Sequence, residues 1–361
     1  MSSGVAILGA GIFAKEAHLP ALAALGAAAP ALKAVYSRSQ ASAHDLADAA
    51  VISLSLSVPP GIYHDIQEES TNLDALFARQ DIDTVVIALP ITLQPSIILR
   101  ALAAGKHVLS EKPVAPDVAG GLELIKTYNE QYKPKGLIWR VAENFEAEPG
   151  YRAAAQAIAA GRIGEVICFR TVVYNYIDKN SKWYKTPWRT VPDYQGGFLL
   201  DGGVHTIAAL RIILPHALTH LTSFASLHKD YLAPHDTIHA IVRAGPVITG
   251  TAELTFAAPT ETRPKADSFV FTGTKGWLTI NQVGSVLRVH IHTNEKTEVL
   301  EEPVCGVQAE LGAFFAAVRK ESGALAIGEP LEALRDVGFI QAALRSAGQL
   351  VDLTELVPSA L

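Results

Sequence analysis

The side chains of Lys112, Asp201 and His205 are of types that could do acid–base chemistry, and two of them, Asp201 and His205, stand close in the sequence. A histidine ionises near neutral pH and can move a proton, and a nearby carboxylate can orient its ring. Asp201 and His205 stand four residues apart, so in a helix both would lie on one face. The alternative for this pair is an N-cap aspartate followed by a buried structural histidine.

Lys112 belongs to the stretch Ser110 to Ala115, which reads Ser-Glu-Lys-Pro-Val-Ala and follows an apolar run. The run predicts a buried strand, so Glu111 and Lys112 would stand where that strand ends. Open α/β sheets bind ligands beyond the carboxyl ends of their strands, where a lysine could serve a reaction. The alternative is an ordinary solvated lysine in a turn set by Pro113. Whether the bond before Pro113 is cis stays open at this point.

The elements around Lys112 predict a parallel sheet. Short apolar runs at residues 5–8, 32–36, 84–89, 108–109 and 136–141 predict buried strands, and helical patterns such as 15–25 and 95–104 alternate with them. This alternation is typical of right-handed βαβ units in a doubly wound α/β domain, here residues 1–145.

A glycine-rich turn follows the first of these strands. Gly9-Ala10-Gly11-Ile12-Phe13-Ala14 has the pattern GxGxxA and stands before a helical stretch. Gly9 would allow the tight turn, Gly11 the close approach of a pyrophosphate, and Ala14 the packing of helix on strand. The pyrophosphate would rest on the helix N-terminus, so Gly9, Gly11, Ile12 and Phe13 are the expected cofactor contacts.

The second strand ends in Ser37-Arg38-Ser39. NAD-specific domains usually have a carboxylate at this point for the ribose 2′-OH, and this chain has none there. The hydroxyls of Ser37 and Ser39 and the planar guanidinium of Arg38 suit a phosphate instead. The sequence therefore favours NADP(H), with NAD(H) possible, and the alternative is a surface turn in which Arg38 only covers the sheet edge.

Composition excludes several classes of function. The 361 residues are 49% hydrophobic and 18% charged with a net charge of −6, which indicates a packed enzyme and gives no basic surface for nucleic acid. No apolar run reaches about 20 residues, so no membrane contact is expected, and cytoplasm is the expected location. Cys168 and Cys305 stand far apart in apolar surroundings and are expected to be buried free thiols, with no metal site.

The pattern changes in residues 146–361. An alanine-rich helix at 151–160 precedes a series of runs that are rich in β-branched and aromatic residues, with few helices between them. Such a series predicts a second, α+β domain with a predominantly antiparallel sheet. The expected strands are residues 166–176, 221–227, 238–243, 248–256, 268–273, 277–282 and 287–293.

Five motifs together resemble one family. GAGIFA, AGKHVLSEKPVA, VAENF, GRIGEV and GGFLLDGGVH are similar to motifs of the glucose-fructose oxidoreductase, inositol dehydrogenase and rhizopine-catabolism family of NAD(P)-dependent oxidoreductases. The resemblance runs from Val5 to His205, and residues 329–349 resemble the family's closing helix, which would pack back on the first domain. It implies a Rossmann domain and an open sheet that serves assembly as a homodimer or homotetramer.

The resemblance also implies roles for particular residues. Lys112, Asp201 and His205 match the family's catalytic residues, and the three are expected to bind substrate as well. The further substrate contacts expected are Asn144, Trp183, Trp188 and Arg189. The two tryptophans could equally belong to the hydrophobic core or to a dimer interface. The further cofactor contacts expected are Leu89, Pro90, Gln94, Glu111 and Lys112.

The chain departs from the family at two places. Many members have an asparagine and a histidine where this chain has Ile91-Thr92-Leu93-Gln94, and many have an acidic residue where it has Ala208 and Ala209. The substrate therefore cannot be copied from any one member.

The sequence predicts an NADP(H)-preferring oxidoreductase that interconverts a secondary alcohol and a carbonyl on a sugar, polyol or related cyclic substrate. Two other functions stay open. One is a non-catalytic sensor or regulator that binds a dinucleotide, because fold does not fix function. The other is an epimerase or glycosidase-type enzyme that uses NAD(P) transiently and regenerates it.

Overall fold

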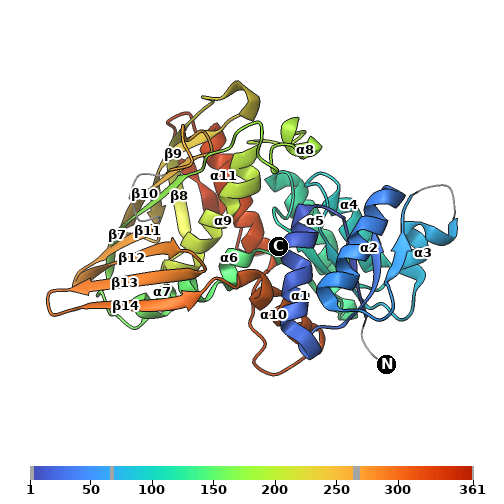
Figure 1. The fold of residues 1–361 in the computed structure, drawn as a ribbon. Coiled ribbons are helices and arrows are strands. Elements are labelled where there is room, and N and C mark those ends of the chain that lie inside the picture. The colour runs from blue at the N-terminus through green and yellow to red at the C-terminus, as the bar shows by residue number, and fades with distance from the viewer. Residues whose placement is uncertain (1–3, 66–68, 263–268, 360–361) are drawn as a thin grey trace.

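The computed structural model describes residues 4–65, 69–262 and 269–359. Figure 1 shows two halves side by side, each built on its own sheet. The helices α9 (Phe198–Ile213) and α11 (Pro330–Arg345) lie between the nine-stranded sheet and the rest of the chain. The order of the elements along the chain confirms the predicted class, a doubly wound α/β half followed by a half with a mostly antiparallel sheet.

The first sheet has six parallel strands in the order β3-β2-β1-β4-β5-β6. Its strands are β1 (Gly4–Leu8), β2 (Ala31–Tyr36), β3 (Gly61–Tyr63), β4 (Thr84–Ile87), β5 (His107–Glu111) and β6 (Trp139–Ala142). The helices between them are η1 (Ala14–His18), α1 (Leu19–Leu25), α2 (Gln40–Leu54), α3 (Leu73–Ala78), α4 (Gln94–Ala103) and α5 (Val118–Gln131). Short 3₁₀ turns lie at η2 (Gly26–Ala28), η3 (Glu69–Thr71) and η4 (Lys133–Lys135).

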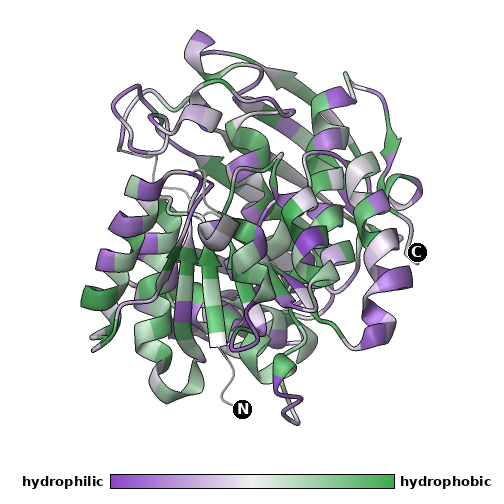
Figure 2. Ribbon diagram, turned by 90° about the vertical axis from the view of Figure 1, so that its right-hand side faces the viewer, coloured by the Kyte–Doolittle hydropathy of each residue, from purple (hydrophilic) through white to green (hydrophobic). Residues whose placement is uncertain are grey.

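Burial explains why these segments form parallel strands. All five residues of β1 and all four of β4 are buried, as expected for strands with helices on both faces. In Figure 2 the strands of this sheet are mostly hydrophobic, and the helices around it carry hydrophilic segments on their outer sides. Because the strands are parallel, the turns after β1, β2, β4 and β5 meet at one edge.

The second sheet has nine strands in the order β14-β13-β12-β11-β7-β10-β9-β8-β15, and only β7 and β10 pair in parallel. Its strands are β7 (Val166–Tyr174), β8 (Leu218–Ser226), β9 (Thr237–Ala244), β10 (Ile248–Thr255), β11 (Phe269–Gly273), β12 (Gly276–Val283), β13 (Val286–Thr293), β14 (Thr297–Pro303) and β15 (Val351–Asp352). The helical segments of this half are α6 (Asn144–Ala147), α7 (Pro149–Ala159), α8 (Pro187–Thr190), α9 (Phe198–Ile213), η5 (Asp230–Leu232), α10 (Gly306–Val318), α11 (Pro330–Arg345) and α12 (Leu353–Leu356).

Two longer elements of this half were not predicted, β14 and α10. β14 is an edge strand whose residues are exposed or half-buried, so it lacks the apolar run that marks the other strands. α10 comes from the second half of the chain but packs on the first sheet, where Leu311, Phe314 and Phe315 join the core formed by β1. Figure 1 shows α10 beside α1.

Smaller differences concern the ends of elements. The expected strand at residues 84–89 ends at Ile87, and the one at 166–176 ends at Tyr174. The expected strand at 268–273 has its first residue, Ser268, outside the described residues. Cys168 and Cys305 are free but half-buried, because each stands in a segment with one side toward solvent.

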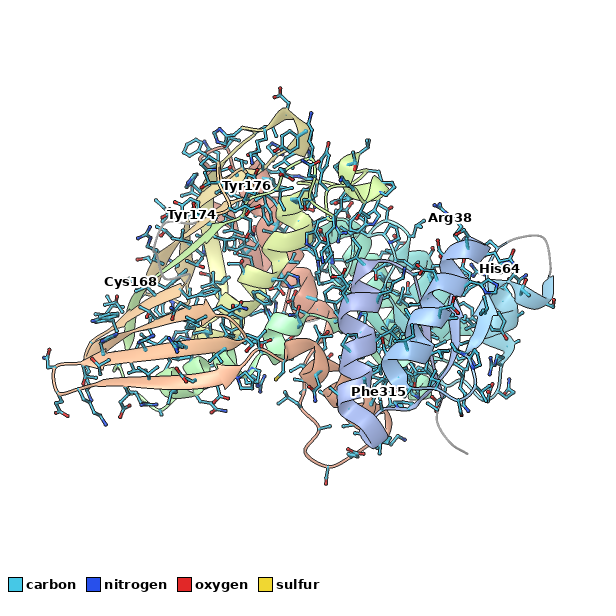
Figure 3. The ribbon with its side chains drawn as sticks, viewed as in Figure 1. Arg38, His64, Cys168, Tyr174, Tyr176 and Phe315 are labelled. Atoms are coloured by element: carbon cyan, nitrogen blue, oxygen red, sulfur yellow. The ribbon has the colours of Figure 1, made fainter. Side chains whose placement is uncertain are left out.

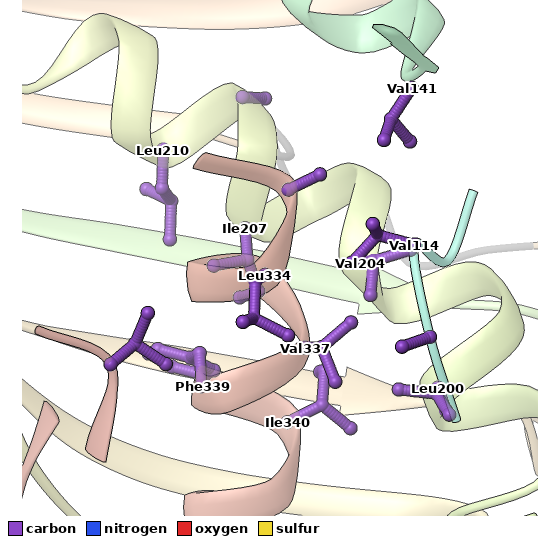
Figure 4. Packing of buried hydrophobic residues seen from close by; sticks show 14 of the residues in the cluster. Val114, Val141, Leu200, Val204, Ile207, Leu210, Leu334, Val337, Phe339 and Ile340 are labelled. Carbon is purple, nitrogen blue, oxygen red and sulfur yellow. The ribbon is translucent and has the colours of Figure 1, made fainter. Parts of the chain in front are cut away.

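The long helix α9 is held against the sheet and against α11. Figure 4 shows side chains of α9 gathering with side chains of α11. Gly202 and Gly203 permit the approach, since a Cβ on Gly202 would lie 2.7 Å from the ring of Phe256 and one on Gly203 would lie 3.1 Å from Ile340 Cδ1. In addition, Arg211 of α9 bonds both carboxylate oxygens of Asp336 of α11 at 3.1 Å. The helix that carries Asp201 and His205 is therefore fixed firmly.

The closing helix contacts both halves of the chain. The side-chain oxygen of Gln341 of α11 accepts a hydrogen bond from the N–H of Val118, the first residue of α5, at 3.0 Å. None of the helices in the described ranges is both long and apolar enough to cross a membrane.

Candidate active site

Lys112 and Asp201 meet although they stand far apart in the sequence. Lys112 follows the last residue of β5, and the peptide bond between Lys112 and Pro113 is cis. Lys112 Nζ donates to the backbone oxygen of Asp201 at 2.7 Å and to Asp201 Oδ1 at 3.0 Å. An ammonium has three N–H donors, so a third remains for another acceptor. Lys112 is thus not the solvated turn lysine of the alternative interpretation.

Arg189 is the second cation on Asp201. Arg189 Nε donates to Asp201 Oδ2 at 2.7 Å, from the short helix α8. Its guanidinium carbon lies 4.0 Å from the ring centroid of Trp188 and 5.2 Å from that of Trp183. Stacking on aromatic rings holds the planar guanidinium in one orientation. In this structure the two predicted tryptophans therefore position Arg189.

The two cations decide the charge of Asp201. Burial alone would raise the pKa of the Asp201 carboxyl, but the ammonium of Lys112 and the guanidinium of Arg189 hold it well below its usual range. Asp201 is therefore ionised at neutral pH, and it fixes both cations at the edge of the first sheet.

His205 has a different carboxylate as its partner. His205 Nδ1 lies 2.6 Å from Glu143 Oε1, and Phe145 stacks on the imidazole with ring centroids 4.8 Å apart. Burial would raise the pKa of Glu143, but His205 and then Lys112 lower it below its usual value. The expectation that Asp201 orients the ring is therefore wrong in detail, because both Asp201 oxygens bond other groups and Glu143 supplies that contact.

Sequence reasoning did not single out Glu143. It stands at the end of β6 inside the VAENF motif, directly before Asn144, which begins α6 and is half-buried. A carboxylate placed after a buried strand was the available signal. Glu143 Oε1 also accepts a hydrogen bond from the N–H of Phe145 at 3.1 Å, so it is both the N-cap of α6 and the partner of His205.

The glycine-rich turn has the shape that a dinucleotide needs. Gly9 has a φ of +114°, and a Cβ there would lie 2.1 Å from the backbone oxygen of Ala88, so only glycine fits. A Cβ on Gly11 would meet nothing within 4 Å. The space over Gly11, at the start of the helix that Ile12 and Phe13 lead into, is therefore open to a ligand.

Gly11→Val is expected to weaken dinucleotide binding while the protein stays folded. The added side chain meets no protein atom at its Cβ but stands where a pyrophosphate would approach, at a cost of about 1–3 kcal/mol, or about tenfold or more in Kd. Isothermal titration of the variant and the wild type, with Tm as the folding control, measures this. Equal Kd values would contradict a phosphate site at this turn.

The end of β2 offers an exposed cation. Figure 3 shows Arg38 near the start of α2, and its side chain is exposed. Ser39 is the N-cap of α2, since its Oγ accepts from the N–H of Ser42 at 3.2 Å, and the N–H of Ser37 donates to the backbone oxygen of Tyr63. On the neighbouring strand end, Asp65 accepts a hydrogen bond from the hydroxyl of Tyr36 at 2.8 Å.

Glu111 and Gln94 are both buried at the same edge. Glu111 Oε1 lies 2.8 Å from Nε2 of His18, so the end of β5 is tied to the helix after the glycine-rich turn. Gln94 begins α4 with 1% of its surface exposed, and within the described part of the chain neither its Oε1 nor its Nε2 has a hydrogen-bond partner. Buried amides are normally paired, so Gln94 is suited to a ligand group at this edge.

Leu89 and Pro90 complete the predicted set. They follow β4, are half-buried, and Leu89 Cδ2 would lie 3.3 Å from a Cβ on Gly9. The glycine-rich turn and the turn after β4 therefore pack on each other. Among the residues that the structure describes, no group of three or more His, Cys, Asp or Glu side chains could hold a metal ion.

Comparisons with known proteins agree with this architecture. Residues 3–135 match the family described as an oxidoreductase family with an NAD-binding Rossmann fold, and residues 151–279 match the GFO/IDH/MocA C-terminal domain. Dehydrogenase FPY6 of Fusarium mangiferae is 40% identical over 353 residues, which cover 95% of this chain and 96% of that protein.

Two further relatives differ more in sequence. A dTDP-3,4-didehydro-2,6-dideoxy-alpha-D-glucose 3-reductase of Streptomyces violaceoruber is 29% identical over 304 residues, covering 77% of this chain and 78% of that protein. The crystal structure of an oxidoreductase from Thermotoga maritima has a TM-score of 0.83 at 28% identity, covering 98% of this chain and 99% of that chain. Since the family matches include most residues of both halves, the chain belongs to the GFO/IDH/MocA family of NAD(P)-dependent oxidoreductases.

Proposed function

We propose that the protein is an NADP(H)-preferring oxidoreductase that interconverts a secondary alcohol and a carbonyl on a sugar, polyol or related small cyclic substrate. The observation that carries the proposal is the meeting of Lys112, Asp201 and Arg189 at the edge where β5 ends, with the Glu143–His205 pair nearby. The similar Streptomyces protein is by name a reductase of a didehydro-sugar, which supports the class of substrate.

Lys112 would act on the reacting oxygen. Two of its N–H donors are directed to Asp201, and the third is available to a substrate hydroxyl or carbonyl. A fixed ammonium stabilises negative charge that develops on that oxygen. Its two hydrogen bonds to the buried Asp201 hold the ammonium in place. Asp201 and Arg189 therefore set the geometry and charge balance of the site.

His205 would take the hydroxyl proton in oxidation or return it in reduction. Glu143 is ionised, so it accepts a hydrogen bond from Nδ1–H, and this tautomer leaves the lone pair of Nε2 for the substrate. With 18% of its side chain exposed, His205 is within reach of a small molecule. A bound nicotinamide nucleotide supplies the hydride chemistry.

The nucleotide would be held by the residues at the carboxyl edge of the first sheet. The pyrophosphate would lie on the glycine-rich turn, formed by Gly9, Gly11, Ile12 and Phe13. The nicotinamide end would lie between this turn and Lys112, beside Leu89, Pro90, Gln94 and Glu111. The side-chain amide of Gln94, which has no hydrogen-bond partner among the described residues, and the open space over Gly11 both fit a bound dinucleotide. Ser37, Arg38 and Ser39 would face the ribose 2′ position.

Arg38→Ala is expected to weaken NADPH binding about tenfold to a hundredfold, since one charged hydrogen-bonding partner of the 2′-phosphate is worth about 1.5–3 kcal/mol. NADH binding should change little, because NADH has no 2′-phosphate. Fluorescence titration of both nucleotides checks the difference. Tighter NADH binding by the wild type would contradict the preference and point to Asp65, held by Tyr36, as the partner of the ribose hydroxyls.

The proposed reaction is tested by titrating the protein with NADPH and NADH and then screening sugars, polyols and cyclic ketones by nicotinamide absorbance. Stoichiometric consumption of the nucleotide supports a simple oxidoreductase. Product formation without net consumption would favour the recycling epimerase or glycosidase. Nucleotide binding without turnover on any substrate would favour the sensor, although a sensor has no need of all three of Lys112, Asp201 and His205.

The outer face of the second sheet supports assembly as a homodimer or homotetramer. Phe224 of β8, Ile241 of β9 and Trp277 of β12 are exposed by 70%, 62% and 42%, and strand register puts them on the same face. Exposed apolar side chains on one face of a sheet suit an interface between subunits. Analytical ultracentrifugation gives the number of subunits, and a monomer at micromolar concentration would refute the proposal.

A further inference from the structure

The chain between β7 and α9 leads from the second sheet toward the edge of the first. Residues 178–194, here called the 178–194 loop, consist of turns around the short helix α8. The loop carries Arg189, which bonds Asp201, and two side chains that reach the first half of the chain, Lys182 and Asp193. Neither Lys182 nor Asp193 has a part in the proposed chemistry.

Lys182 contacts the helix that follows the glycine-rich turn. Its Nζ forms an ion pair with Glu16 of η1, although the two residues stand 166 positions apart. The side chains of Lys182 and Glu16 are 52% and 55% exposed. Exposed ion pairs stabilise a structure only slightly, so this contact can open easily.

Asp193 contacts the turn after β4. The hydroxyl of Thr92 donates to Asp193 Oδ2 at 3.1 Å, and Asp193 is exposed. Thr92 stands between Pro90 and Gln94, two of the residues expected beside the nicotinamide end of a nucleotide. The second contact of the loop is therefore also polar and close to solvent.

The two contacts lie on either side of the switch point of the first sheet. η1 leads from β1 toward β2, and the turn with Thr92 leads from β4 toward β5. β1 and β4 are paired neighbours, and the chain moves away from them in opposite directions, as the strand order β3-β2-β1-β4-β5-β6 shows. Dinucleotides bind across such a point in Rossmann folds. The 178–194 loop touches both sides of it and therefore spans the place where the nucleotide would lie.

The loop is joined more firmly to the second half of the chain. At its start, the backbone oxygen of Ile177 accepts hydrogen bonds from the Tyr231 hydroxyl at 2.9 Å and from Lys229 Nζ at 3.0 Å. Tyr184 packs edge to face on Tyr231, with ring centroids 5.4 Å apart, and Tyr194 at the end of the loop is buried. Buried aromatic packing is stronger than an exposed polar contact. The loop would therefore stay on the second half when its two polar contacts with the first half open.

We propose that the 178–194 loop is a lid that closes over the bound dinucleotide and opens to release it. The inference rests on the proposed oxidoreductase function, in which the spent nucleotide has to leave after each turnover. Lid opening limits the rate of product release in many enzymes. Contacts as weak as Lys182–Glu16 and Thr92–Asp193 suit a lid, because it opens in every cycle.

Lys182→Glu tests the lid, because it places two carboxylates against each other. We expect the dissociation rate of NADPH to rise about twofold to fivefold, the effect of one exposed ion pair. The double variant Glu16→Lys with Lys182→Glu restores the pair with exchanged charges, and its rate should return close to that of the wild type. Asp193→Ala should raise the rate by a similar factor, and the rise should be larger when it is combined with Lys182→Glu. Stopped-flow nucleotide fluorescence measures these rates, with Tm as the folding control.

Lys179→Glu is the matched control. It makes the same change of charge within the loop, but Lys179 Nζ lies over the ring of Tyr231 in the second half, 5.3 Å from the ring centroid. Its NADPH dissociation rate should equal that of the wild type. Equal effects of Lys182→Glu and Lys179→Glu, or no recovery in the double variant, would overturn the lid while leaving the oxidoreductase assignment intact. A wild type that binds neither NADPH nor NADH would instead overturn the proposed function, and the lid with it.

Discussion

Lys112→Met is expected to lower kcat by about 10²- to 10³-fold, the usual effect of removing one fixed donor from a developing oxyanion. Methionine retains the length and apolar stem of lysine but has no charge and no donor. Asp201 keeps its bond to Arg189, so the carboxylate stays paired and the protein should remain folded. NADPH affinity should be nearly unchanged, because in the proposed mechanism the third donor of Lys112 serves the substrate oxygen and not the nucleotide phosphates.

Lys106→Met is the matched control. Lys106 is buried and stands directly before β5, at the other end of that strand from Lys112, and its Nζ bonds the backbone oxygens of Arg79 and Ile82 at 2.7 Å. Its loss should lower Tm but leave the turnover of the folded protein unchanged. Steady-state kinetics and NADPH titration on both variants measure whether the loss of turnover is specific to Lys112. Full activity in Lys112→Met, or equal loss in the two variants, would refute the role of Lys112.

The sequence predicted most of the fold because the signals were local. Buried apolar runs, the GxGxxA turn and the Ser110–Ala115 stretch each identify a strand and the turn at its end, and βαβ handedness then orders the first sheet. The position of α10 could not be derived in this way. Its apolar residues Leu311, Phe314 and Phe315 are as consistent with packing on the second sheet as with packing on the first.

The sequence predicted most residues of the site, but it did not predict which of their side chains contact each other. Spacing on a helix correctly put Asp201 and His205 one turn apart, yet it could not tell which carboxylate faces the imidazole. That depends on how β6 and α9 lie in space, and the contact between Glu143 and His205 spans 62 positions. The same holds for Trp183 and Trp188, whose stacking on Arg189 depends on a segment with little regular structure.

His205→Asn is expected to lower kcat by about 10²- to 10⁴-fold, the range for loss of a general acid or base. The Asn side-chain nitrogen can occupy the place of Nδ1 and keep the hydrogen bond to Glu143, while the group that exchanges a proton with substrate is removed. The variant therefore isolates Nε2 from the anchoring of the ring. KM should change little, because under the proposal Lys112 would still bind the substrate oxygen.

His107→Asn is the control for His205→Asn, since His107 stands at the start of β5 and accepts a hydrogen bond from the N–H of Ile138 at 3.1 Å, away from the carboxyl edge. Glu143→Gln adds the converse test, because it keeps the imidazole and an oxygen acceptor but removes the negative charge that stabilises the protonated ring. If Nε2 exchanges the proton, both His205→Asn and Glu143→Gln lose turnover with nucleotide binding retained, and His107→Asn does not. Wild-type kcat in His205→Asn would assign proton transfer to another group, and Lys112, which is proposed to bind the same oxygen, would be the next residue to test.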